Sequence, residues 1–223
     1  NLDWGFNKHP PFSAFAVEFF YSIFGANDWS YYLLSQIFVI IAFFFVWKFS
    51  KEIFEDKIYS LLSVLILSGI YFYNFTTPEF NVNVSLLPFW ALSVYFFWKG
   101  LNSDNKINWI LFGIFSALGF LSKYLFIYLL ASFLIYFIFN LKKFKKFIPY
   151  YFLSIMISLI LLIPHFIWLF ENNFVTIFYG LKRSGLSDFA AMNHLINPLL
   201  FLMKQILILI PFFFNDFYDF KKK

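Results

Sequence analysis

Residues 29–47 read WSYYLLSQIFVIIAFFFVW, an apolar run without a charged side chain. A helix of about 20 apolar residues crosses the hydrocarbon core of a bilayer, and lipid offers no hydrogen-bond partner to a backbone that is not helical. Similar runs recur along the chain, and spans are predicted near 29–47, 58–75, 82–98, 108–122, 124–140, 147–170 and 195–214. The sequence therefore predicts an all-α, polytopic transmembrane bundle of about seven spans.

The composition agrees with a membrane protein. Apolar residues make up 61% of the 223 positions and charged residues only 13%, about half the charged share of a soluble domain. A soluble helical bundle is the alternative, and this composition disfavours it. We treat residues 1–223 as one transmembrane domain. Because the first residue is Asn rather than Met, we expect a fragment of a larger protein, cut at Asn1.

The distribution of basic residues predicts the orientation in the membrane. If the spans alternate, most of the 17 Lys and Arg residues fall in loops on one side: Lys48, Lys51, Lys57, Lys99, Lys106, Lys142, Lys143, Lys145, Lys146 and Lys221 to Lys223. Lysine-rich short loops stay in the cytoplasm, so residues 1–28 are predicted to face the periplasm from the inner (plasma) membrane. The charge follows topology rather than forming a patch, so no nucleic-acid partner is expected.

Residues 108–140 indicate an unusual position for Lys123. Both flanks are predicted to be cytoplasmic, so this stretch crosses twice with about 16 residues, or roughly 24 Å, in each arm. The turn at Ser122–Lys123 is then expected slightly below the outer surface. A lysine at that depth is costly unless an anion meets it, and a lipid phosphate is the anion at that level. The alternative is that the Lys123 side chain extends to the membrane interface, or snorkels, and meets no lipid phosphate there.

The external segment 1–28 carries further polar candidates. Its double proline at 10–11 favours the start of a helix, and the apolar spacing that follows predicts a helix over about 12–24. That helix is too short to span and is expected to lie in the interface. Lys8 and His9 come directly before it. The alternative is that this segment has no role in binding and that its aromatic residues only anchor it in the membrane interface.

Other polar residues lie in or near the predicted outer loops. Glu79 follows Thr-Pro in a tight turn and is either a cavity residue or a solvated carboxylate. Lys182 and Arg183 share the last outer loop, and Arg183 is the only arginine of the chain; its planar fork suits phosphate or carboxylate. Gln205 lies inside the last span, where polar side chains face a cavity or a neighbouring helix.

Motifs for other chemistry do not appear in the sequence. No nucleotide-binding loop, catalytic triad or metal-ligand spacing is present, so no metal site is predicted and a divalent cation as cofactor is left open. His165 and Trp168 are three residues apart and share a helix face. We interpret that pair as helix packing.

Five stretches of the chain, in order, resemble a known family. They are LDWGFNKHPPFSAF (2–15), TPEFNVNVSLLPFWAL (77–92), GFLSKYLFIYLL (119–130), PHFIWLFENNF (164–174) and KQILILIPFFF (204–214). They resemble segments of membrane glycosyltransferases of the dolichyl-phosphate-mannose–protein mannosyltransferase type, which have the GT-C fold. The resemblance implies transfer of a sugar from a polyprenyl-phosphate donor to a lipid, glycan or protein acceptor on the outer side, among membrane lipids.

The resemblance also implies roles for individual residues. His9 stands where aminoarabinose transferases of this type have a lysine that meets the donor phosphate. Lys123 matches the lysine of the family's LSK segment, and Glu79 matches the acid of its TPD turn. Lys8 departs from the Asp usual at its position. The family's catalytic acidic pair would precede Asn1, so no catalytic residue is assigned.

The candidate residues form two sets. The donor-phosphate set is His9, Lys8, Lys123 and Arg183, and the substrate-cavity set is Glu79, Lys182 and Gln205. The residues alone leave two other functions open. A secondary transporter would show inverted repeats and broken helices near the middle of the bilayer. A non-catalytic membrane assembly subunit would need no cationic cluster at the depth of phosphate.

Overall fold

Helices are the regular secondary structure in the part of the chain that the structure describes. In the computed structural model this part is residues 2–183 and 196–207, and it contains no strand. The elements are α1 (Phe12–Phe24), α2 (Asp28–Phe54), α3 (Lys57–Gly69), α4 (Tyr71–Asn74), α5 (Val82–Asn102), α6 (Lys106–Ser122), η1 (Tyr124–Phe126), α7 (Ile127–Phe139), α8 (Leu141–Phe144), η2 (Lys145–Phe147), α9 (Ile148–Glu171) and α10 (Val175–Arg183). A further helix covers Ile196–Leu207. The predicted all-α fold is confirmed.

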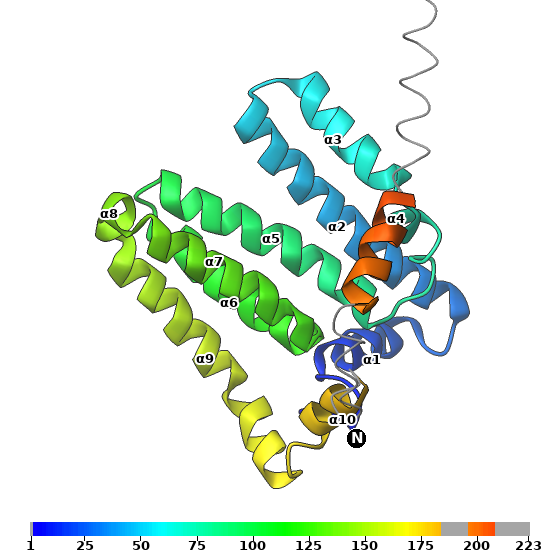
Figure 1. The fold of residues 1–223 in the computed structure, drawn as a ribbon. Helices are drawn as coiled ribbons and strands as arrows, with labels where there is room; N and C mark the ends of the chain where they lie inside the picture. The colour runs from blue at the N-terminus through cyan, green and yellow to red at the C-terminus, as the bar shows by residue number, and fades with distance from the viewer. Residues whose placement is uncertain (1, 184–195, 208–223) are drawn as a thin grey trace, which may run out of the picture. The chain divides into compact units, whose positions relative to one another are not determined.

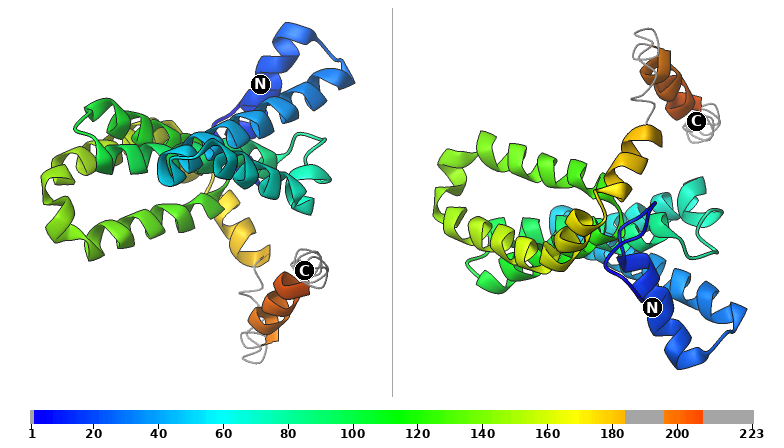
Figure 2. Two further views of the ribbon diagram at one scale, coloured as in Figure 1. Left: turned by 90° about the horizontal axis from the view of Figure 1, so that it is seen from above. Right: turned by 90° about the horizontal axis from the view of Figure 1, so that it is seen from below.

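The chain divides into two compact units, Asn1–Thr176 and Ile177–Lys223. In the first unit, α2 packs on α5, α5 on α6, and α6 on α9, while α3 lies along α2 (Figure 1 and Figure 2). The central helix α5 therefore has neighbours on two sides. Trp109 of α6 is completely buried against α5, where a Cβ on Gly100 would lie 2.7 Å from its indole.

Helices α6 and α9 approach each other closely at small residues. The Ser154 hydroxyl donates to the Trp109 carbonyl at 2.8 Å, and the Ser158 hydroxyl donates to the Gly113 carbonyl at 2.7 Å. A Cβ on Gly113 would lie 2.6 Å from the Ser154 carbonyl oxygen. Small side chains and hydroxyls allow such backbone contact between helices in membranes.

The helices have the lengths and surfaces of a multi-pass membrane protein. Among the described residues, Asp28–Phe54, Val82–Asn102 and Leu141–Glu171 are long and apolar enough to cross a bilayer. Large apolar side chains point outward along them; Phe170, for example, is 72% exposed. Aqueous exposure of this kind is unfavourable, so lipid is the natural solvent for these faces. The chain is a multi-pass membrane protein.

The helices coincide with the predicted spans in most places. Helix α6 and the pair η1–α7 provide the two short arms expected within 108–140, with the break at Lys123. The expected span 58–75 is instead divided, because α3 ends at Gly69 and Ile70 adopts an extended conformation before α4. Glycine is a poor helix former, which accounts for the end of α3. Part of the expected span 195–214 lies outside the described residues. That each helix crosses a bilayer stays a prediction.

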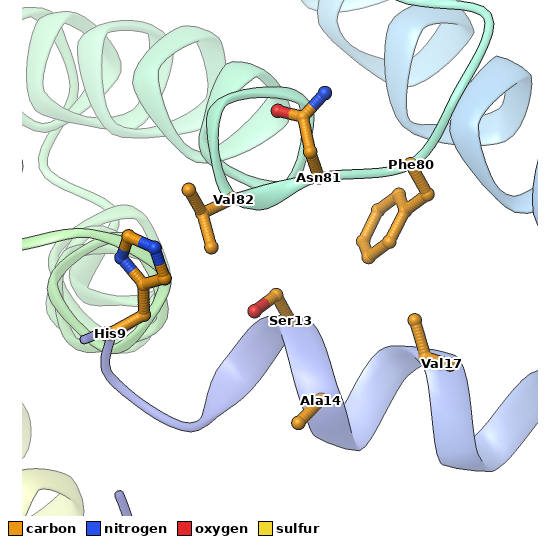
Figure 3. Close-up of a pocket in the computed structure, with 7 residues that line it drawn as sticks. All are labelled: His9, Ser13, Ala14, Val17, Phe80, Asn81 and Val82. Carbon is orange, nitrogen blue, oxygen red and sulfur yellow. The ribbon is translucent and has the colours of Figure 1, made fainter. Parts of the chain in front are cut away.

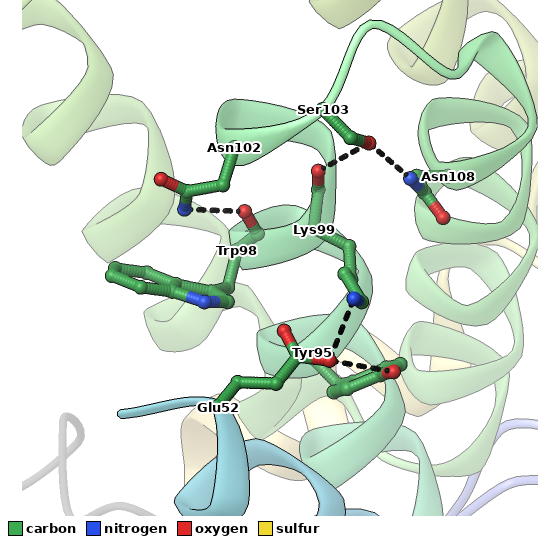
Figure 4. A network of polar contacts seen from close by, with 7 residues as sticks. All are labelled: Glu52, Tyr95, Trp98, Lys99, Asn102, Ser103 and Asn108. Carbon is green, nitrogen blue, oxygen red and sulfur yellow. Dashed lines mark hydrogen bonds and ion pairs between the residues drawn. The ribbon is translucent and has the colours of Figure 1, made fainter. Parts of the chain in front are cut away.

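Polar residues gather at both ends of the helices of the first unit. At one end, the Glu52 carboxylate of α2 forms an ion pair with Lys99 of α5 at 2.7 Å and accepts a hydrogen bond from the Tyr95 hydroxyl at 3.1 Å (Figure 4). At the other end, α1 contacts α2, α5 and α6 (Figure 1). This second end holds most of the predicted site residues.

Candidate functional site

Lys123 lies in a tight turn between α6 and η1. Its backbone is extended (φ −162°, ψ 134°), and its N–H donates to the Gly119 carbonyl at 3.1 Å. The chain returns at once, because the Phe126 N–H donates to the Lys123 carbonyl at 3.0 Å. Phe126 is completely buried against Gly119. The sequence GFLSKYLF therefore forms a compact reversal that holds Lys123 at the end of α6.

The side chain of Lys123 reaches the first turn of α5. Its Nζ donates a hydrogen bond to the Asn83 Oδ1 at 2.5 Å. Asn81 caps this helix, since its Oδ1 accepts from the N–H groups of Asn83 at 2.9 Å and Val84 at 3.3 Å. The N-terminus of a helix carries a partial positive charge. The ammonium group of Lys123 and the partial charge at the start of α5 thus both make the electrostatic potential positive at this place.

His9 lies beside the same end of α5. It lines a cavity of about 400 Å³ between α1 and the start of α5. Figure 3 shows His9, Ser13, Ala14 and Val17 on the side of α1, facing Phe80, Asn81 and Val82. The predicted helix 12–24 is confirmed, and it begins after a double proline whose residues are both buried. His9 and Lys123 therefore both approach the first turn of α5, from different segments.

Glu79 faces a second cavity next to the first. This cavity has a volume of about 260 Å³ and is lined by Asp28, Tyr31, Tyr32, Glu79 and Phe80. Phe80 belongs to the lining of both cavities. Two carboxylates and two phenol rings therefore surround a space that adjoins the His9 cavity.

Lys8 lies on the segment Leu2–His9, which packs on the end of α9 and which we call the N-terminal strap. The Trp4 carbonyl forms a hydrogen bond with Nδ1 of His165, and the Phe6 carbonyl accepts from the Thr176 hydroxyl at 2.6 Å. Lys8 itself is exposed. Sequence reasoning interpreted His165 as helix packing and did not identify it as the partner of a segment 161 positions away.

The remaining candidates belong to the second compact unit. Lys182 and Arg183 are the exposed last residues of α10, and Gln205 lies on the helix Ile196–Leu207. Their proximity to the other candidates stays a prediction. Among the residues described, no group of three or more His, Asp or Glu is arranged to hold a metal ion.

Comparisons with known proteins identify the family of the chain. A family model described as dolichyl-phosphate-mannose-protein mannosyltransferase matches residues 8–168. A curated relative is the undecaprenyl phosphate-alpha-4-amino-4-deoxy-L-arabinose arabinosyl transferase of Wigglesworthia glossinidia brevipalpis, 32% identical over 142 residues, which are 61% of this chain and 25% of the relative. No solved structure matches the chain. The family match includes both cavities, the Lys123 turn and most of α9, and the chain belongs to the dolichyl-phosphate-mannose-protein mannosyltransferase family.

Proposed function

We propose that the protein is a membrane glycosyltransferase that moves a sugar from a polyprenyl-phosphate donor to a lipid, glycan or protein acceptor. The family supports the reaction class, and the relative's name supports an undecaprenyl-phosphate donor. The observation that carries the proposal is that Lys123 and His9, from segments more than a hundred residues apart, both approach the first turn of α5.

The chemistry of the transfer explains the need for positive charge at this place. The acceptor's hydroxyl or amine forms a bond to the sugar's anomeric carbon and gives its proton to a general base. The bond from that carbon to the phosphate oxygen breaks, and its electron pair stays on the leaving polyprenyl phosphate. Positive groups placed in advance around that oxygen stabilise the developing charge. Lys123, His9 and Lys8 are the proposed groups. Arg183 stays a candidate that is predicted from the sequence, because its planar guanidinium group suits phosphate.

The acceptor is proposed to use the second cavity. Carboxylates such as Glu79 and Asp28 accept hydrogen bonds from sugar hydroxyls or amines, while Tyr31 and Tyr32 offer apolar ring faces with a polar edge. Lys182 and Gln205 stay candidates for substrate binding that are predicted from the sequence alone. The connection through Phe80 would bring the acceptor next to the donor phosphate.

The location follows from the same proposal. We place the site on the periplasmic side of the inner membrane, with the lysine-rich loops in the cytoplasm. The chain has no cysteine, so single cysteines at Asn7 and Asn102 can be labelled selectively in it. A membrane-impermeant maleimide is expected to label Asn7→Cys in intact cells with a permeable outer envelope, and Asn102→Cys only after the inner membrane is opened. The reverse pattern would contradict this orientation.

The proposed function is tested by the affinity for the lipid phosphate itself. Undecaprenyl phosphate is titrated into the purified protein in nanodiscs, and binding is followed by native mass spectrometry. Lys123→Met is expected to weaken binding by about tenfold, as for loss of one charge-assisted hydrogen bond. Lys142→Met, an exposed lysine of α8, is the matched control and should change nothing. Equal affinities for both variants and the unchanged protein would reject the phosphate site, and solute flux into vesicles without donor lipid would favour a transporter.

A further inference from the structure

The imidazole of His165 joins two segments that are distant in sequence. The side chain is completely buried; its Nδ1 bonds to the Trp4 carbonyl and its Nε2 to the Tyr124 hydroxyl, the latter at 2.8 Å. A carbonyl oxygen only accepts, so Nδ1 carries the hydrogen in this contact. In a neutral ring Nε2 is then an acceptor, and the Tyr124 hydroxyl donates to it. Both ring nitrogens are therefore used.

The two joined segments are those that carry the proposed phosphate-binding cations. Trp4 belongs to the N-terminal strap, which ends in Lys8 and His9. Tyr124 follows Lys123 directly and begins η1. One buried ring on α9 thus links the strap to the Lys123 turn.

The neighbours of His165 hold the strap in one register. Trp168 stacks on the imidazole, with ring centroids 6.3 Å apart and an angle of 9° between the planes. Gly5 lies against the same indole, so closely that a Cβ would come within 2.3 Å of it. The Thr176 hydroxyl donates a hydrogen bond to the carbonyl of Phe6. Three consecutive strap residues are thereby fixed. Two of the residues that hold them, His165 and Thr176, also interact with Tyr124 of the Lys123 turn, and His165 does so with a ring whose other nitrogen bonds to the strap.

We propose that His165 is a positioning residue of the donor-phosphate site, which sets the spacing between the strap cations and Lys123. The inference rests on the proposed function and adds a residue that does not itself touch the donor. An apolar side chain would leave the Trp4 carbonyl and the Tyr124 hydroxyl without this partner, and a buried unsatisfied polar group destabilises its conformation. The strap and the turn would then separate, and one phosphate would no longer meet both.

The two contacts of the ring can be removed one at a time. The amide of an asparagine side chain lies near the position of Nδ1. His165→Asn therefore keeps a donor for the Trp4 carbonyl and loses the hydrogen bond with the Tyr124 hydroxyl. Tyr124→Phe removes the same contact and leaves the imidazole intact, but it also removes the interaction of the Tyr124 hydroxyl with Thr176. His165→Leu removes both contacts of the ring. For undecaprenyl phosphate in nanodiscs, His165→Leu is expected to weaken binding by about tenfold and the other two variants less. The double variant His165→Asn/Tyr124→Phe should bind no more weakly than Tyr124→Phe alone, because the contact between these two side chains is already absent in that variant.

A second measurement reports the strap directly. Nitroxide labels on cysteines introduced at Asn7 and Asn102, both exposed and both in the first unit, should give one narrow distance distribution by pulsed electron paramagnetic resonance. His165→Leu should broaden that distribution while circular dichroism stays unchanged. Tyr124→Phe should leave the strap in place, because the Trp4 contact remains, and still weaken binding.

The outcomes separate this inference from the proposed function. If His165→Leu and Tyr124→Phe bind undecaprenyl phosphate like the unchanged protein while Lys123→Met binds weakly, the positioning role is wrong and the function stands. If Lys123→Met binds normally, the phosphate site fails, and the inference fails with it. A narrow, unshifted distance distribution in His165→Leu would also overturn the inference.

Discussion

The ring of Phe126 packs on Gly119 so closely that a Cβ on Gly119 would lie 2.5 Å from its Cε2 atom. This contact closes the turn that holds Lys123. We predict that Gly119→Ala displaces η1 and costs about 1–3 kcal/mol of stability, as overpacking of a buried site does. Thermal unfolding in detergent should show the loss, and the affinity for undecaprenyl phosphate should fall with it.

Gly180 provides the matched control for this substitution. It lies in α10, and a Cβ there would meet nothing within 4 Å. Gly180→Ala should therefore leave the unfolding temperature unchanged or raise it slightly, because alanine is the better helix former. If both alanine variants unfolded alike, the tight contact with Phe126 would not be what shapes the turn.

The second prediction concerns the hydrogen bond between Lys123 and Asn83. Asn83→Asp replaces a neutral amide with a carboxylate beside the ammonium group, and this carboxylate competes with a phosphate for the same charge. We expect the affinity for undecaprenyl phosphate to fall by about tenfold, and less in Asn83→Ala. Asn108→Asp, at the opposite end of the bundle where Asn108 bonds to Ser103, should have no effect on binding. Tighter binding in Asn83→Asp would show that Lys123 does not face the phosphate.

The third prediction concerns the ion pair at that opposite end. The side chains of Lys99 and Glu52 are 37% and 27% exposed, so solvent weakens their attraction. Glu52→Gln should lower the free energy of unfolding by about 1 kcal/mol or less and leave the affinity for undecaprenyl phosphate unchanged. Glu55 is an exposed residue directly after α2, and Glu55→Gln is the control for loss of charge alone. A loss of lipid-phosphate binding in Glu52→Gln would mean that the site is not confined to the end with Lys123.

Local patterns in the sequence were sufficient to predict several features. The double proline and the spacing of apolar residues predicted α1 at 12–24, where it is found. The number of residues between two lysine-rich flanks predicted a break at Ser122–Lys123, and α6 ends at Ser122. Each of these predictions depends on residues close together in the chain, for which helix geometry alone gives the answer.

Other features depend on residues that only the folded chain brings together. The break after Gly69 interrupts an apolar run that hydropathy alone does not divide. The bonds of His165 to Trp4 and Tyr124 join segments that share no local pattern. A histidine inside an otherwise apolar run was the available signal, because a buried imidazole needs partners for both nitrogens. The sequence did not identify those partners.

The backbone contact between α6 and α9, at Gly113 and Ser154, has a consequence for how a substrate enters. With hardly any side-chain layer between them, these two helices have little freedom to slide apart. The Lys123 turn and His165 lie at their adjoining ends, where the hydrogen bond between Tyr124 and His165 joins them. A passage wide enough for a long isoprenoid tail is therefore expected to open along α1, which lines the His9 cavity, rather than between α6 and α9.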